Sequence, residues 1–222
     1  MEDRKWERIG ALGGVVFVVL VLVAAFLPGS PPSTSDPTSK IVKWVADNGK
    51  EIRWAGYLGA LAVIPFFWWV GSLWRLLRRA EGGVPRLAVV AALGATFAAA
   101  TGAISGVILA VLPIAANRPI DAPQLRTVYL LGSAVGFMSL FGISALIGAA
   151  SVVFVRSRVM PAVLGWFGIF VALLVLVGAY GTVSTRDAVM AFGFASYLLS
   201  TLWVLVTSIL MFRDAREGAR AG

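Results

Sequence analysis

Residues 93–110 read LGATFAAATGAISGVILA, and this stretch decides the fold. It contains no charged residue, and small side chains recur at every fourth position, at Gly94, Ala98, Gly102, Gly106 and Ala110. Such a face lets helix backbones approach closely where lipid tails provide no hydrophobic force between helices. The pattern therefore predicts a membrane-spanning helix at the centre of a helical bundle.

The composition of the whole chain indicates the same environment. Its 222 residues are 59% hydrophobic and 14% charged, with a mean hydropathy of +0.88, whereas soluble domains are about 45–50% apolar and about 25% charged. A spanning helix needs about 20 mostly apolar residues. We expect an all-α, polytopic membrane protein, a six-helix bundle forming a single domain over residues 1–222. The expected spans cover residues 9–27, 54–77, 87–113, 127–155, 161–180 and 188–212.

The first apolar run has a second interpretation, as a signal peptide. The apolar part of a signal peptide is usually about 7–15 residues long and leads to a small-residue cleavage site. The run from Ile9 to Leu27 is longer and ends at Pro28 and Gly29. We interpret it as an uncleaved first helix.

The long loop at residues 28–53 opens with a stretch rich in Pro, Ser and Thr and is expected outside the cytoplasm. Asp36 and Pro37 are typical of a helix start, and Asn48 followed by Gly49 is typical of a helix end. Between them, apolar residues fall on one face: Ile41, Val42, Trp44 and Val45. The pattern predicts a short amphipathic helix over residues 37–48, lying on the membrane surface or on the bundle's own loops.

The basic residues orient the chain. A net charge of +8 would suggest nucleic acid in a soluble protein, but here Lys and Arg lie between the apolar runs, so no nucleic-acid partner is expected. The two ends and two of the short loops hold 12 of them, against 3 in the two short loops of the opposite side. Because cytoplasmic loops carry the excess of Lys and Arg, we expect both termini in the cytoplasm and the protein in the cell membrane.

Arginines in the expected cytoplasmic loops are candidate contacts for anionic lipid head groups, each worth about 1 kcal/mol near the surface. They are Arg75, Arg78, Arg79, Arg86, Arg156 and Arg158. Ordinary determination of topology explains the same residues equally well.

The residue types that are missing exclude several chemistries. The chain has no Cys and no His, which removes thiol catalysis, the commonest metal ligand and the usual general base. No cofactor or metal is therefore expected. Every acidic residue and every lysine falls outside the apolar cores, whereas proton relays and ion-coupled transport use ionisable groups inside the membrane. A lysine to activate a serine is also missing there, so we expect no enzyme.

The polar groups expected inside the membrane are hydroxyls beside small residues, on the third, fourth and sixth spans. The candidates are Thr101, Ser105, Ser133, Ser144, Ser196 and Ser200. They could line a cavity between these spans or bond to nearby backbone, where each contributes about 0.6 kcal/mol. The sequence favours packing contacts over a pore.

Polar residues of the short outer loops form a further candidate group. They are Asn117, Arg118, Asp121, Arg126, Tyr180, Arg186 and Asp187. They could gather into a site on the outer face, but helix caps and surface ion pairs explain them more simply.

Two longer runs resemble a known family. Residues 41–83, IVKWVADNGKEIRWAGYLGALAVIPFFWWVGSLWRLLRRAEGG, combine a loop helix with a span that ends in a basic A-E-G-G turn. Residues 159–179, VMPAVLGWFGIFVALLVLVGA, contain a P-x-x-L-G-W motif. Both are similar to uncharacterised six-helix, multi-pass membrane proteins of high-GC Gram-positive bacteria, whose function is unknown. The resemblance implies compartment and topology and brings no activity or binding residues.

Two functional hypotheses follow. The first is a non-enzymatic membrane protein that acts by interaction, as an accessory subunit, scaffold or sensor of lipid or partner. Its expected partners are the lipid bilayer and either a further copy of the chain or another membrane protein. The alternative is a small channel or uncoupled permease with a path between the third, fourth and sixth spans. A continuous hydrated cavity there would favour transport, and dry packing would remove it.

Overall fold

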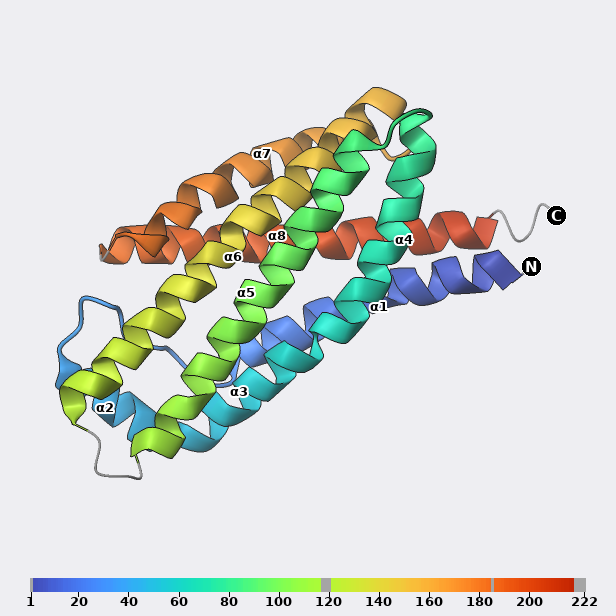
Figure 1. The fold of residues 1–222 in the computed structure, drawn as a ribbon. Coiled ribbons are helices and arrows are strands. Elements are labelled where there is room, and N and C mark those ends of the chain that lie inside the picture. Colours follow the sequence, from blue (N-terminus) through green and yellow to red (C-terminus); the bar gives the residue numbers. More distant parts are fainter. Residues whose placement is uncertain (1, 117–120, 185, 218–222) are drawn as a thin grey trace.

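The computed structural model describes residues 2–116, 121–184 and 186–217, and helices dominate it (Figure 1). The elements are α1 (Glu2–Phe26), α2 (Thr38–Asp47), α3 (Gly49–Leu61), α4 (Val63–Glu81), α5 (Arg86–Ala116), α6 (Ala122–Ser157), α7 (Ala162–Gly178), the 3-10 helix η1 (Ala179–Thr182) and α8 (Asp187–Glu217). Within the described residues, six segments are long and apolar enough to cross a membrane. The prediction of an all-α, six-span protein is confirmed.

The second span differs most from its expected bounds. It runs over Gly49–Glu81 and consists of α3 and α4, whereas the apolar pattern placed it at residues 54–77. The two helices are separated at Ala62, three residues before Pro65. A proline ring clashes with the carbonyl four residues earlier, which here belongs to Leu61, the last residue of α3.

The amphipathic helix is present as α2, and its apolar face packs on the bundle. Ile41 and Val45 are 0% and 1% exposed. They contact a small cluster that includes Leu112 of α5 together with Leu125 and Tyr129 of α6. Of the two alternatives left open by the sequence, the structure therefore shows the helix packed against the protein.

The small-residue face of α5 winds around the helix. At one end, a Cβ added to Gly94 would lie 2.7 Å from the carbonyl oxygen of Gly142 on α6. At the other end, a Cβ on Gly56 of α3 would lie 2.6 Å from the carbonyl oxygen of Gly106. Four residues exceed one turn of about 3.6 residues, so the two ends face different helices. Gly102, between them, has no such neighbour within 4 Å.

The bundle has two ends with different character. We call the end with the α4–α5 and α6–α7 turns the basic end, since Arg78, Arg86 and Arg156 lie there, and the end with α2 the loop end. The α4–α5 turn is closed by Glu81, whose carboxylate accepts the backbone N–H groups of Leu87 and Ala88 at 3.0 and 2.9 Å. The A-E-G-G motif thus caps the start of α5.

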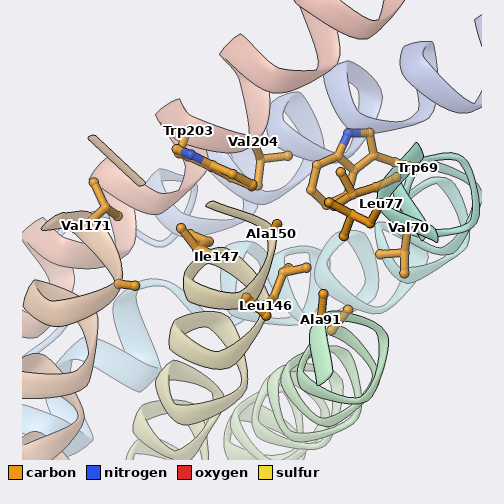
Figure 2. Close-up of a cluster of buried hydrophobic side chains, with 14 of the residues drawn as sticks. Trp69, Val70, Leu77, Ala91, Leu146, Ile147, Ala150, Val171, Trp203 and Val204 are labelled. Carbon is orange, nitrogen blue, oxygen red and sulfur yellow. The ribbon is translucent and has the colours of Figure 1, made fainter. Parts of the chain in front are cut away.

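Large side chains fill the bundle on the basic-end side. Trp69, Trp203 and Phe154 are each 0% exposed, and Leu73 and Leu77 are buried beside them. The rings of Phe154 and Trp203 stack with centroids 5.9 Å apart, and Trp69 meets Trp203 edge-on at 6.4 Å. Figure 2 shows Trp69, Leu77 and Trp203 in this cluster. We call these five residues the aromatic core.

Candidate functional site

A cavity of about 340 Å³ lies on the loop-end side of the aromatic core. Its walls come from α1, α3, α4, α5, α6 and α8. Pockets that hold small molecules have volumes of about 300–1,000 Å³. No charged residue of the described chain is among those that line the cavity. It is suited to an apolar molecule.

Short side chains create this space. The residues that face it from three helices include Ala24, Ala25, Gly59, Ala98, Gly102 and Gly106. A Cβ added to Gly59 or Gly102 would meet no atom of another residue within 4 Å. The helices nevertheless stay in place, because α5 packs on α3 and α6 while α1 packs on α4 and α8. The cavity is thus a consequence of small residues where these helices face one another.

The loop-end side of the cavity is covered by residues 28–37, which we call the roof loop. Pro28 and Pro31 line the cavity together with Trp44 of α2. The indole Nε1 of Trp44 donates a hydrogen bond to the carbonyl oxygen of Pro28 at 3.0 Å, and its ring meets Tyr129 edge-on. The loop and α2 therefore form one cover.

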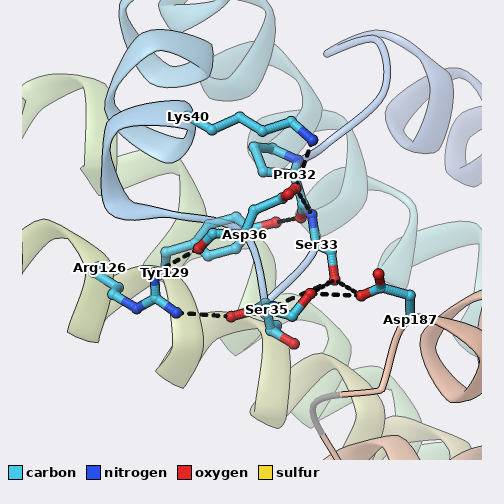
Figure 3. A network of polar contacts seen from close by, with 9 residues as sticks. Pro32, Ser33, Ser35, Asp36, Lys40, Arg126, Tyr129 and Asp187 are labelled. Atoms are coloured by element: carbon cyan, nitrogen blue, oxygen red, sulfur yellow. Dashed lines mark hydrogen bonds and ion pairs between the residues drawn. The ribbon is translucent and has the colours of Figure 1, made fainter.

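Polar contacts tie the roof loop to two distant helices (Figure 3). From α6, Arg126 donates to the carbonyl oxygens of Asp36 and Thr34 at 2.6 and 3.0 Å. The hydroxyl of Tyr129 donates to the carbonyl oxygen of Pro32. From α8, the carboxylate of Asp187 accepts hydrogen bonds from the hydroxyls of Ser33 and Ser35. The loop is fixed at both sides of the cavity.

Asp36 stabilises the roof loop internally. The predicted helix start at Asp36 and Pro37 is correct in position, but the Asp36 side chain does not cap α2. Its carboxylate accepts the Lys40 ammonium group and the Ser33 backbone N–H, each at 2.8 Å. These two contacts, the Lys40 hydrogen bond first, hold the pKa of Asp36 below its ordinary value of 3.8.

The opposite side of the cavity ends at the aromatic core. Phe17, Phe66 and Val204 line the cavity there. The ring of Phe66 lies 4.5 Å from that of Phe17 and 5.7 Å from that of Trp69, centroid to centroid. Since the core beyond them is fully buried, this side of the cavity is closed by large side chains.

The hydroxyl candidates from the sequence separate into two groups. Ser105 and Ser200 line the cavity, and donate to the carbonyl oxygens of Gly132 and Tyr197 at 2.8 and 2.6 Å. The other four do not line it and also donate to backbone carbonyls: Thr101 to Phe97, Ser133 to Tyr129, Ser144 to Ala172 of α7, and Ser196 to Gly193.

Sequence reasoning missed several lining residues. Ser139 and Thr201 were not candidates, although they line the cavity beside Ser105 and Ser200. Tyr197 was missed as well. It could have been found as a tyrosine within the apolar run of the sixth span. The lining residues on α1 and α3 are marked in the sequence only weakly, by pairs of neighbouring small residues.

The arginine candidates lie at the basic end, far along the helices from the roof loop. Arg75 is half-buried, and the others are exposed: Arg78, Arg79, Arg86, Arg156 and Arg158. The Arg78 guanidinium lies 5.3 Å from the centroid of the Trp74 ring. These residues take no part in the cavity.

The outer-loop candidates are only partly brought together. Arg126 and Asp187 both hold the roof loop. Asp121 precedes α6 and accepts the Gln124 N–H with its backbone carbonyl, while Tyr180 and Arg186 are exposed. Asn117 and Arg118 lie outside the described residues.

Within the described part of the chain, no group of three or more acidic residues could hold a metal ion.

Comparisons with known proteins identify the family. No curated protein and no solved structure matches the chain. A family model described as a domain of unknown function, DUF4386, matches residues 10–211. This match extends from the first turns of the α1 span to the end of the α8 span, and includes every cavity wall. The chain therefore belongs to the DUF4386 family, whose function is unknown.

Proposed function

We propose that this protein is a non-enzymatic membrane protein that binds an apolar molecule of the lipid class in its cavity and acts as a sensor or accessory subunit. The cavity itself is the observation that carries the proposal. An apolar molecule in the cavity gains dispersion contacts with the whole apolar lining. A membrane supplies such molecules at high concentration.

The residues that line the cavity favour binding of a molecule over catalysis. Its polar side chains are hydroxyls, one phenol and one indole, and the whole chain has neither His nor Cys. General acid–base catalysis at neutral pH needs a group that titrates near that pH. The described cavity residues supply none, which favours a binding role.

The closed side of the cavity supports binding over conduction. A channel needs a continuous hydrated path between the two membrane faces. The aromatic core fills the bundle between the cavity and the basic end, with Trp69 and Trp203 both 0% exposed. The hydroxyls are already bonded to backbone, which favours packing contacts rather than a polar pathway.

The proposal includes the location of the protein. We place it in the cell membrane of a high-GC Gram-positive bacterium, with both termini and the basic end in the cytoplasm, where the arginines would contact anionic head groups. The distribution of basic residues and the resemblance of two sequence runs support this placement. A reporter fused to the C-terminus should read cytoplasmic, and an external reading would refute the orientation.

The binding proposal is tested by filling the cavity. Gly102→Leu places a side chain into it, because a Cβ there meets no atom within 4 Å. Gly71→Leu is the matched control, since Gly71 is an exposed glycine of α4 that does not line the cavity and has equal space. Native mass spectrometry should find co-purified lipid on the wild type and Gly71→Leu and less on Gly102→Leu. Equal occupancy in all three proteins would refute the cavity as the site.

A further inference from the structure

Tyr197 differs from every other polar side chain that lines the cavity. The hydroxyls of Ser105, Ser139, Ser200 and Thr201 each donate to a backbone carbonyl, and the Trp44 indole donates to Pro28. The Tyr197 hydroxyl makes no hydrogen bond to any residue that the structure describes, and protein atoms do not seal it off. One residue of the cavity lining, Tyr197, therefore carries a hydroxyl that no described protein group accepts from.

A phenol in this position is costly without a partner. The Tyr197 ring packs against the hydrophobic cluster that contains the aromatic core. A hydroxyl in apolar surroundings that lacks a hydrogen bond costs about 1–3 kcal/mol, and a tyrosine hydroxyl among apolar groups usually has a partner. A phenylalanine would fill the same space without this cost. The free donor therefore indicates an acceptor that the protein itself does not supply.

We propose that the cavity binds a neutral single-chain amphiphile, whose apolar chain fills the space and whose one uncharged oxygen accepts a hydrogen bond from Tyr197. This inference rests on the proposed function and names its ligand class. The cavity volume of about 340 Å³ is near the lower limit for small-molecule sites, which suits one chain rather than two.

The absence of charge among the described lining residues restricts the class of ligand further. A charged group taken from water into apolar surroundings needs a partner of opposite charge. None of the described lining residues carries a charge, so a carboxylate, sulfate or ammonium group has no partner in the cavity. An alcohol or an ester carbonyl satisfies Tyr197 without this cost.

The experiment compares three photoreactive probes in liposomes that contain the whole protein. They are a medium-chain primary alcohol, the alkane of equal length and the corresponding alkyl sulfate, each with a diazirine in the chain and a terminal alkyne. Labelling of cavity peptides is measured by mass spectrometry over a concentration series. One hydrogen bond of about 0.5–1.5 kcal/mol predicts that the alcohol labels the wild type at about 2- to 10-fold lower concentration than the alkane.

Variants distinguish the contribution of the Tyr197 hydrogen bond from that of the cavity volume. Tyr197→Phe should abolish the advantage of the alcohol and leave alkane labelling unchanged. Gly102→Leu should reduce labelling by both probes, while Gly71→Leu should reduce neither. If Gly102→Leu does not fold, Gly102→Ala serves in its place with a smaller effect, because its methyl group meets no atom within 4 Å.

Each outcome decides a different claim. Absence of cavity labelling by both the alcohol and the alkane would overturn the proposed function. Equal labelling by alcohol and alkane, in the wild type and in Tyr197→Phe, would leave an apolar site and overturn the neutral-amphiphile proposal alone. That proposal also fails if the sulfate labels as well as the alcohol, or if Tyr197→Phe lowers alcohol and alkane labelling equally.

Discussion

The basic end and the loop end of this bundle are packed in opposite ways. Trp69, Trp203 and Phe154 are fully buried towards one end, whereas glycines and alanines leave a cavity of about 340 Å³ towards the other. Lipid provides little hydrophobic force between helices, so direct contacts hold them together. Dense aromatic packing and open space are therefore separated along the helix axes, and the proposed binding site lies where the packing is least dense.

The largest expected effect is the loss of an aromatic side chain at the filled end. Trp203→Ala removes the ring that stacks on Phe154 and meets Trp69, and should lower the free energy of unfolding by about 3–5 kcal/mol. Phe17→Ala is the counterpart at the cavity, where one side of the ring already borders empty space. Denaturation by SDS in mixed micelles measures both. An equal loss in the two variants would contradict the division between the ends.

A smaller effect is expected from the close approach of α5 and α6. In Gly142→Ala the new methyl carbon would lie 2.5 Å from the Gly94 carbonyl oxygen and 2.7 Å from the Ala98 nitrogen, and such overpacking costs about 1–3 kcal/mol. Gly102→Ala is the matched control, because it makes the same change beside the cavity without a clash. Unfolding midpoints should fall for Gly142→Ala alone. A fall of equal size in both would refute the close-contact argument.

The roof loop offers a third, more local test. Tyr129→Phe removes the hydrogen bond to the Pro32 carbonyl, worth about 1 kcal/mol. Because the chain has no cysteine, a nitroxide attached to Ser30→Cys reports on this loop alone. Its mobility should increase while the unfolding midpoint barely changes. Tyr57→Phe, at a 59% exposed tyrosine, should leave it unchanged, and an unchanged spectrum in Tyr129→Phe would show that the bond does not hold the loop.

The smallest expected effect is that of pH on the same loop. Contacts with Lys40 and Ser33 lower the pKa of Asp36, so they stabilise the folded loop above the ordinary carboxyl pKa of 3.8 and are lost as the pH falls through the lowered value. The nitroxide at position 30 should gain mobility only in that acidic range. Asp36→Asn should diminish this step, whereas Asp47→Asn in α2 should not.

The sequence predicted the elements that depend on local patterns. Apolar runs identified the six spans, and the residues around Asp36 and Asn48 gave α2 its bounds to within a residue or two. The helical segment that contains the second span starts before the expected residue 54, because the charges at Lys50, Glu51 and Arg53 interrupt the apolar run although the helix continues through them.

The sequence indicated a possible cavity between the third, fourth and sixth spans, but its full lining could not be predicted, because it depends on how helices are rotated against one another. The regular spacing of Gly94 and Gly106 indicates a close contact but does not name α6 for one residue and α3 for the other. Likewise, the sequence shows that residue 197 is a tyrosine but does not show whether its hydroxyl makes a hydrogen bond. Such facts belong to tertiary structure.

The bonds of the roof loop also have a consequence for biosynthesis. Ser33 and Asp187 are 154 positions apart in the chain, and translation adds about 5–20 residues per second. The loop therefore waits about 8–30 s between its own synthesis and that of its last partner. During this interval the loop can be held by Arg126 and Tyr129 of α6, but the cavity lacks the wall that α8 supplies. The contacts of the roof loop are thus completed only when α8 arrives.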